Sequence, residues 1–355
     1  MKRLLLVICC AIIILPCFIT KYAYSQDDLV LYKGPVEHVF THCLLADPEL
    51  SFNKDNPMRK DYDIDCITKD EFKKALTNLY NNNYVLVDIY SIYHTKNGIA
   101  KKQHLYLPKG KKPLILSFDD VNYDHRKMSL GMIDKLILDK NGNLASFTSN
   151  KTPQINYDDE FVLIVENFIK KHPDFSFNNA RGVLCLTGYD GILGYRIQHK
   201  NPNYKQEIKQ VQPIVNKLKQ LGWRFASHSF GHYHMKNISN EHFRQEVVSW
   251  QTQVEPIVGK TEIYVYPYGE WEIFDKDGNI SYKHQLLQDA GFKLFCGVGI
   301  QPYFSYLPNK KGNKVLFMDR TPFDGNTFRS KATMLKRLID VNAVYDHSLR
   351  PSKLI

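Results

Sequence analysis

The chain has 355 residues and a formal net charge of +10, with 43% hydrophobic and 24% charged residues. Its length exceeds that of the commonest domains but is ordinary for one α/β domain. The lysines are scattered, and no basic helix or aromatic RNA-binding motif is present, which excludes a typical nucleic-acid-binding protein. For an exported protein, the positive charge either suits the anionic polymers of a cell envelope or serves only solubility.

The N-terminal segment predicts export. Two basic residues precede an apolar run over residues 4–19, and the small-residue pattern Ala23-Tyr24-Ser25 follows. We predict a secretory signal peptide over residues 1–25, which makes the protein extracellular or part of the cell envelope. The run is slightly shorter than the roughly 18–20 residues of a membrane span, and an uncleaved membrane anchor is the alternative. Residues 26–355 are expected to form one domain, since no repeat or low-complexity linker divides them.

The cysteines do not indicate a disulfide framework. Three of the seven fall in the N-terminal segment, which leaves Cys43, Cys66, Cys185 and Cys296. Four cysteines spread over so long a chain are unlike a disulfide-rich scaffold. A Cys43–Cys66 bridge stays open as an alternative, whereas Cys185, in an apolar strand-like run, is expected to pack in the core.

Apolar strand-like runs alternate with amphipathic helices along the chain. A helix begins at the capping box Thr68–Glu71, and later helices end at Gly222 and begin after Ser239. A D-x-N-G turn within residues 136–144 predicts an inserted β-hairpin. The predicted strands cover residues 85–87, 113–118, 182–186, 223–226, 263–266, 293–295 and 315–317. The alternation predicts a mainly parallel sheet, either open or closed into a barrel.

Two of these strands end in residues that are typical of a metal site. Asp119 and Asp120 follow one strand, and His228 and His232 follow another. Functional side chains of parallel α/β folds lie at the carboxyl ends of the strands. Histidines four apart can bind one metal ion, so that one aspartate completes a His₂Asp site and the other lies beside a water as its base. A solvated turn is the alternative for either pair taken alone.

Together these segments resemble the polysaccharide deacetylases, the NodB-homology or carbohydrate esterase 4 family. Ser117–Asp120 and His228–His232 are similar to its first two motifs, and Tyr264–Gly269 is similar to the third. The resemblance extends from about residue 36 to the C-terminus. It implies an α/β fold, a distorted and incompletely closed (β/α) barrel, to which the inserted hairpin is added here.

The resemblance also implies the chemistry. Asp120, His228 and His232 would bind a divalent metal, usually Zn²⁺, with Co²⁺, Ni²⁺ and Mn²⁺ as alternatives. Asp119 would be the base for a metal-bound water that attacks the carbonyl of an N-acetylated hexosamine. The expected activity is removal of N-acetyl groups from a peptidoglycan-like polysaccharide of the cell envelope.

Two positions depart from the family pattern. Val265 stands where an arginine usually precedes the third-motif proline by two residues, and no histidine follows a leucine by two places. Arg320, just after another predicted strand, is the candidate substitute for the arginine, with a surface ion pair to Asp319 as the alternative. His42, at an early strand end, is the candidate general acid, whereas His234 is expected to be structural.

Substrate contacts are expected from groups around the site. The resemblance implies that Pro267 and Tyr268 border the acetyl group, where a backbone N–H stabilises the oxyanion. Tyr189, in a glycine- and tyrosine-rich segment, and Trp271, just after the third motif, are candidates for stacking on sugar rings. For the segment around Tyr189, the alternative is a structural loop whose glycines adopt positive φ.

Two other functions stay open. Related barrels remove O-acetyl groups from xylan, and the missing arginine and histidine motivate a catalytically silent barrel that binds glycan. The complete set of Asp119, Asp120, His228 and His232 favours an enzyme, because a binding module needs no base beside its metal ligands.

Overall fold

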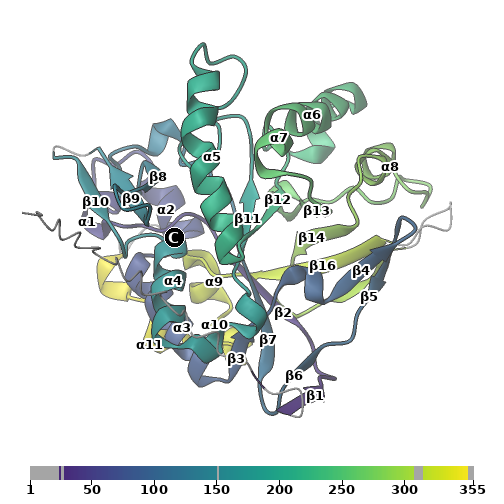
Figure 1. Ribbon diagram of the computed structural model, residues 1–355, viewed down its shortest axis with the longest axis horizontal. Coiled ribbons are helices and arrows are strands. Elements are labelled where there is room, and N and C mark those ends of the chain that lie inside the picture. The colour runs from purple at the N-terminus through teal and green to yellow at the C-terminus, as the bar shows by residue number, and fades with distance from the viewer. Residues whose placement is uncertain (1–23, 25–27, 150–151, 308–314, 351–355) are drawn as a thin grey trace, which may run out of the picture.

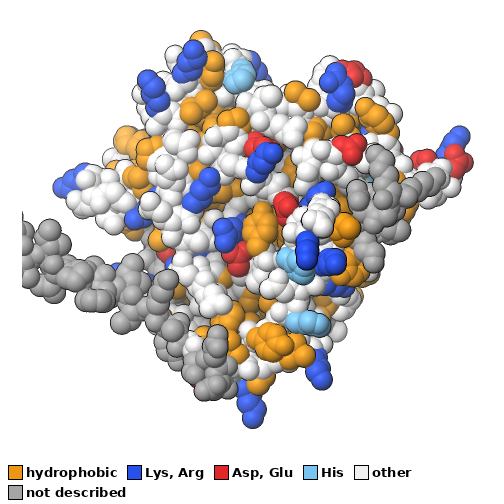
Figure 2. All heavy atoms as spheres, turned by 45° about the vertical axis from the view of Figure 1, so that its right-hand side comes forward, with side chains coloured by type: hydrophobic (Ala, Val, Ile, Leu, Met, Phe, Trp, Pro, Cys, Tyr) orange, Lys and Arg blue, Asp and Glu red, His pale blue; other side chains and the backbone are white. Residues whose placement is uncertain are grey.

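The computed structural model describes residue 24 and residues 28–149, 152–307 and 315–350 (Figure 1). The predicted signal peptide or anchor over residues 1–25 lies outside the described residues, apart from Tyr24. Among the helices of the described ranges, none has the length and apolar character to cross a membrane. On the face that Figure 2 shows, Lys and Arg side chains are dispersed among neutral and hydrophobic ones rather than gathered in one patch.

Seven parallel strands form a ring at the centre of the molecule. Their order around the ring is β11, β12, β13, β14, β16, β2 and β7, and β7 pairs again with β11. The predicted (β/α) barrel is therefore confirmed, but its expected incomplete closure is wrong, because β7 pairs with β11 and closes the ring. The closure is weakly hydrogen-bonded: only two residue pairs join β7 to β11, and one joins β12 to β13. The ring strands are β2 (Glu37–Thr41), β7 (Lys112–Phe118), β11 (Val183–Leu186), β12 (Arg224–Ser227), β13 (Ile263–Val265), β14 (Leu294–Val298) and β16 (Val315–Pro322).

The predicted β-hairpin is confirmed and is longer than expected. β8 (Lys135–Leu138) and β9 (Leu144–Thr148) pair antiparallel, and β10 (Gln154–Asn156) adds a third strand. The Asp139 carboxylate accepts the backbone N–H groups of Asn141 and Asn143, each at 2.8 Å, so it closes the turn. The remaining strands are β1 (Leu29–Leu31), β3 (Tyr84–Leu86), β4 (Tyr93–Lys96), β5 (Ile99–Lys102), β6 (Tyr106–Pro108) and β15 (Phe304–Leu307).

The predicted helix ends agree with the observed caps. Thr68 and Glu71 form the reciprocal capping box, Ser239 caps the next predicted start, and Gly222 ends its helix with a positive φ of 103°. Helices cover the outside of the ring, as Figure 1 shows for α3, α4, α5 and α6. The helices are α1 (Pro48–Ser51), α2 (Arg59–Asp65), α3 (Lys69–Asn81), α4 (Phe161–Lys171), α5 (Tyr204–Leu221), α6 (Asn240–Gln253), α7 (Glu255–Val258), α8 (Tyr282–Asp289), α9 (Gly325–Ser330), α10 (Ala332–Leu335) and α11 (Val341–Val344).

The inside of the ring changes from apolar to polar along the strands. Alternate residues of β7 point inward, and the inward sequence runs from Ile115 through Ser117 to Asp119. On β16 the inward series runs from Met318 to Arg320. The interior toward the amino ends of the strands is therefore a hydrophobic core, and the carboxyl ends of the strands carry charged groups.

The four cysteines of the domain are free thiols buried in the core. Cys185 and Cys296 lie inside the ring with the other inward-facing apolar residues, as expected for Cys185. Cys43 and Cys66 pack outside it in the larger core, and the disulfide between them does not form in the structure.

Candidate metal centre

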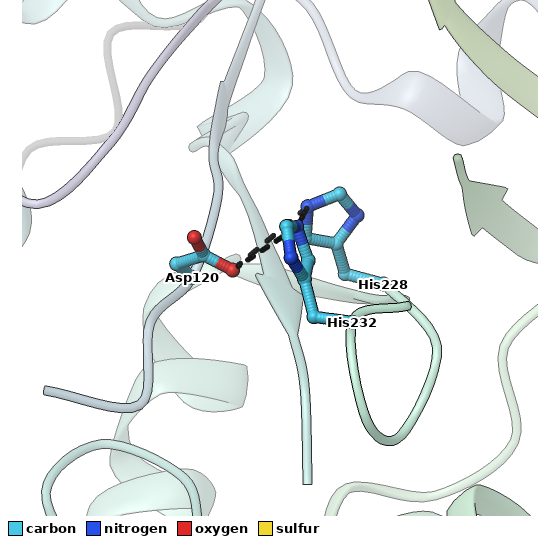
Figure 3. Close-up of side chains that lie close together, drawn as sticks. All are labelled: Asp120, His228 and His232. Carbon is cyan, nitrogen blue, oxygen red and sulfur yellow. Dashed lines mark hydrogen bonds and ion pairs between the residues drawn. The ribbon is translucent and has the colours of Figure 1, made fainter. Parts of the chain in front are cut away.

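Asp120, His228 and His232 converge at the carboxyl end of the barrel (Figure 3). Asp120 follows β7, and both histidines lie in the loop that follows β12. The two Nε2 atoms are 3.2 Å apart, and Asp120 Oδ1 lies 3.9 Å from Nε2 of His228 and 3.6 Å from Nε2 of His232. Ligand atoms about 2.0–2.1 Å from a tetrahedral metal are separated by about 3.3 Å. The three donor atoms thus have the spacing of a metal-binding face.

The backbone of this site adopts a conformation that costs free energy. Asp120, Ser229 and His232 have φ values of 56°, 58° and 56°, in the left-handed region that residues other than glycine rarely occupy. Each such residue costs about 1–3 kcal/mol, and it keeps this conformation only where surrounding contacts hold it in place. Here the His232 N–H donates to Ser229 Oγ at 3.0 Å, and Glu246 of α6 accepts the N–H of Gly231.

The three donor side chains have the orientation and the free acceptor atoms that a cation needs. His228 Nδ1–H donates to the carbonyl oxygen of Val265 at 2.9 Å, so the lone pair of Nε2 faces Asp120. Burial lowers the pKa of His232 to about 4, with Asp120 acting in the opposite direction, and the imidazole is neutral at pH 7. Asp120 Oδ1 is buried and has no hydrogen-bond partner in the described part of the chain. An orphaned carboxylate oxygen facing two imidazole nitrogens fits a divalent metal.

Arg320 holds the second aspartate, Asp119. Its Nη1 and Nη2 donate to the two oxygens of Asp119 at 2.7 Å and 2.9 Å, and both side chains are buried. Burial would raise the pKa of Asp119, but Arg320, with His228, holds it well below its usual range. Asp119 Oδ2 also lies 3.7 Å from His228 Nε2, so this carboxylate borders the proposed metal position. The alternative for Arg320, a surface ion pair with Asp319, is wrong because its side chain is inside the ring.

A buried polar network fixes Arg320. Its Nη1 also donates to Ser117 Oγ at 3.2 Å, its Nε donates to the carbonyl oxygen of Gly297 at 3.3 Å, and its guanidinium lies 4.1 Å from the ring centroid of Phe40. His38 Nε2 contacts Ser117 Oγ at 3.0 Å. Burial of the imidazole lowers the pKa of His38, and the nearby positive charge of Arg320 lowers it further. Neither His38 nor Ser117 was predicted to have a role in the site, although a polar residue at an inward position of a buried strand is a signal for one.

The proposed general acid, His42, lies near the same site. Its Nδ1 is 2.9 Å from the carbonyl oxygen of Asp65, which orients the ring from outside. The imidazole is partly exposed, and its charge helps to lower the pKa of Asp119 and Asp120. This placement leaves His42 Nε2 as the atom that could donate a proton.

Tyr268 lies beside the candidate metal ligand His232, in a short 3₁₀ turn that also contains Pro267. Tyr268 has a φ of 58°, its ring centroid lies 4.5 Å from that of His232, and it stacks on His234 at 3.7 Å. His234 Nδ1 in turn lies 3.1 Å from Glu270 Oε1. His234 therefore packs against Tyr268 and lies outside the group of candidate metal ligands, which agrees with the expectation that it is structural.

The two aromatic candidates for sugar binding lie in different environments. Tyr189 donates its hydroxyl to Asp124 at 3.2 Å, and burial raises its pKa to about 12. The N–H groups of Gly188 and Tyr189 both donate to the carbonyl oxygen of Phe230 at 2.9 Å, which joins this loop to the histidine loop. Trp271, by contrast, is 46% exposed. Tyr189 is therefore placed to stabilise the loop, and Trp271 offers a free aromatic face.

A second group of possible ligands is already neutralised. Asp124, His125 and Asp190 lie close together, but Asp124 pairs with Arg126 and Asp190 lies 3.3 Å from Nη1 of Arg196. Their charges are balanced by guanidinium groups, so this group does not fit a cation.

Comparisons with known proteins agree with the site. Residues 195–289 match the family profile described as polysaccharide deacetylase, and this range includes both histidine ligands and the third motif. No curated protein sequence matches the chain significantly.

Among solved structures, the chain is similar to the Streptococcus pyogenes deacetylase PplD in complex with acetate, at 13% identity and a TM-score of 0.45, covering 83% of this chain and 95% of that one. It is also similar to BA3943 of Bacillus anthracis, a CE4 family pseudoenzyme, at 12% identity and a TM-score of 0.27, covering 49% and 54% of the two chains. A family 4 acetyl xylan esterase from Clostridium thermocellum, in complex with cobalt, matches at 15% identity and a TM-score of 0.23, covering 38% and 49%.

These TM-scores lie below 0.5, so the assignment rests on the profile match and on the residues themselves. The profile covers the second and third motifs, and the first motif supplies Asp119 and Asp120 in the geometry described above. Over residues 195–289, the chain is therefore similar to the polysaccharide deacetylase family.

Proposed function

We propose that this protein is a metal-dependent hydrolase that removes N-acetyl groups from an N-acetylhexosamine-containing glycan of the cell envelope. The observation that carries the proposal is the pairing of Arg320 with Asp119, beside the donor face of Asp120, His228 and His232. A barrel that only bound glycan would have no need of a buried carboxylate held by two hydrogen bonds beside metal ligands.

Asp120, His228 and His232 would hold a divalent cation, with Zn²⁺ favoured by two nitrogen donors and one oxygen donor at tetrahedral spacing. When bound, the metal supplies Lewis-acid chemistry to water and to an acetyl carbonyl. The three protein donors occupy one side of the metal position, which leaves the other side for substrate.

Asp119 accepts the proton of the attacking water. Its lowered pKa keeps it ionised at neutral pH, and Arg320 fixes both oxygens so that the carboxylate has one orientation. Each oxygen keeps a second lone pair for the proton. Arg320 thereby performs from β16 the positioning that Val265 of β13 lacks the side chain to perform.

The remaining groups complete the reaction. Water adds its oxygen to the acetyl carbon, and a backbone N–H at Tyr268 faces the negative charge that develops on the carbonyl oxygen. The carbon–nitrogen bond then breaks, and His42 gives a proton to the departing nitrogen. The products are acetate and a free amine on the glycan.

The setting supports an envelope substrate. The N-terminal segment has the pattern of an export signal, and the excess of positive charge suits anionic polymers outside the cell. We therefore propose N-acetylated glycan of the peptidoglycan type as the substrate class.

Two measurements test the proposal. Metal analysis of the purified protein should find one divalent ion per chain, which His228→Ala loses and His234→Ala, as a matched control, retains. Acetate release should occur from N-acetylated peptidoglycan or chito-oligomers, and Asp119→Asn should keep the metal but lose turnover. A protein that binds no divalent metal refutes the metal centre, and release of acetate only from O-acetylated xylan refutes the N-acetyl assignment.

A further inference from the structure

The outer face of β16, next to the candidate site, carries a second set of exposed groups. Side chains of a strand alternate, so Arg320 points into the ring toward Asp119 and Asp319 points to the outside. On the adjacent antiparallel strand end, the carbonyl oxygen of Tyr303 accepts the N–H of Asp319 at 3.0 Å. Asp319 and Tyr303 are therefore cross-strand neighbours on one face.

Two half-exposed aromatic rings flank this position. Trp271 and Tyr303 both pack against Phe317, each with its ring centroid 6.1 Å away and at interplanar angles of 72° and 62°. Phe317 is 6% exposed, whereas Trp271 and Tyr303 are 46% and 48% exposed. The buried ring fixes two outer rings whose other sides face solvent. We refer to Trp271, Tyr303, Phe317 and Asp319 as the β16 flank.

Asp319 adds a polar group to the aromatic pair. Its carboxylate lies over two glycines, because a Cβ at Gly299 would be 2.7 Å from Oδ2 and one at Gly297 would be 3.0 Å from Oδ1. Residues with side chains at these positions would clash with the carboxylate. Partial burial raises the pKa of Asp319, and no described side chain forms a hydrogen bond or ion pair with it. The carboxylate therefore has unused acceptor capacity beside the aromatic rings.

The β16 flank is continuous with the candidate metal centre. Tyr268, which contacts His232, is three residues before Trp271 on the same loop. This loop lies against the end of β14, where a Cβ at Gly269 would be 2.7 Å from Cγ2 of Val298. Asp319 of the flank directly precedes Arg320 in β16, and Arg320 binds Asp119 on the inner face. A chain molecule bound at the metal ligands can therefore extend over this face.

We propose that the β16 flank is a binding subsite for a further sugar ring of the same glycan chain whose acetyl group is being hydrolysed. Aromatic faces bind the apolar C–H face of a pyranose ring, and a carboxylate accepts hydrogen bonds from its hydroxyl groups. The inference rests on the proposed function and extends it, since it names the surface on which a second ring of that glycan binds.

Tryptophan fluorescence can observe this subsite directly. Of the three tryptophans in the chain, Trp223 and Trp250 are 1% exposed, so Trp271 alone contacts solvent. We would titrate the metal-loaded full chain, in the Asp119→Asn form that prevents turnover, with chitohexaose and with chitobiose. Chitohexaose should shift the emission and protect Trp271 from acrylamide quenching, whereas chitobiose should do neither at the same concentration of sugar rings.

Substitutions then assign the binding. Tyr303→Ala and Asp319→Asn should each weaken chitohexaose binding about three- to tenfold. In otherwise wild-type enzyme, Tyr303→Ala should raise KM for chitohexaose by a similar factor and leave kcat/KM for chitobiose within twofold. Tyr106→Ala, which removes an aromatic ring of 55% exposure on β6, is the matched control and should change neither.

The outcomes separate this proposal from the proposed function. Acetate release from chitohexaose with no change in Trp271 fluorescence, or an equal effect of Tyr303→Ala on both oligomers, overturns the subsite. Sugar-dependent fluorescence in a protein whose wild-type form releases no acetate supports the subsite and refutes the deacetylase.

Discussion

Replacing Arg320 by methionine tests the buried ion pair on which the proposed base depends. Methionine keeps an unbranched apolar side chain of similar length inside the ring but removes the positive charge. Asp119 would then be buried, 2% exposed, with no counter-charge beside it, and it would lose both hydrogen bonds from the guanidinium. Removing one partner of such a pair typically destabilises a protein by about 3–5 kcal/mol.

We therefore expect Arg320→Met to lower the free energy of unfolding by about 3–5 kcal/mol, measured by urea unfolding of EDTA-treated protein at pH 7. Asp119→Asn should also be destabilising, because it leaves Arg320 without its counter-charge. The double variant should be more stable than the sum of the two single effects predicts, by about 2–3 kcal/mol. Turnover by Arg320→Met should fall at least about 100-fold, since an unoriented base is misplaced by an ångström or more.

Arg244→Met provides the control. Arg244 forms an ion pair with Glu241 in which both side chains are about half exposed and the pair is screened by solvent, so its loss should leave the stability nearly unchanged. Additive effects in the double variant, or wild-type stability and turnover in Arg320→Met, would refute the reasoning.

Three further predictions concern other parts of the molecule. Zn²⁺ at about 100 times its dissociation constant should stabilise the EDTA-treated protein by about 2.7 kcal/mol in thermal unfolding, and a His228→Ala variant should show no such gain. His38→Gln should lower kcat with KM unchanged, because it perturbs Arg320 only through Ser117, and Ser117→Ala should reproduce the effect; a change in KM alone would contradict this. His284 is buried against the Tyr266 hydroxyl, and burial lowers its pKa to about 4. Below about pH 6.5, His284 therefore binds a proton in the unfolded chain but not in the folded protein, so the free energy of unfolding should fall by about 3 kcal/mol between pH 6.5 and 4. A smaller loss over the same pH range in His284→Gln would verify the assignment.

Local patterns in the sequence were sufficient for several elements of the fold, including the strand that precedes Asp120. The capping box at Thr68, the hairpin turn at Asp139 and the strand before Asp119 are each specified by a few neighbouring residues, and each is confirmed. The rule that parallel strands end at one edge of the sheet predicted that one of the two aspartates would meet His228 and His232, and the family resemblance named Asp120.

Features that depend on strand register could not be predicted from the sequence. The closing pair of β7 and β11, and the antiparallel pairing of β15 with β16, join segments whose alignment no local pattern fixes. The link from His38 through Ser117 to Arg320 requires three strands to bring inward positions to one level. Arg320 could be named as a candidate because it follows the predicted strand over residues 315–317, but β16 continues to Pro322, and the partner of Arg320, Asp119 rather than Asp319, depended on which face of β16 points inward.

The narrow junction between β7 and β11 has a consequence for metal exchange. Only Ser117 and Phe118 of β7 pair with β11 there, and they directly precede Asp119 and Asp120. Opening of this junction would carry Asp120 away from the two histidines, which lie beyond β11 on the β12 side. A bound ion would therefore act as a cross-link that spans β7, β11 and β12. The rate at which the ion is released would therefore depend on a local opening of the barrel, which amide hydrogen exchange at Val183 and Cys185, whose N–H groups face β7, would report.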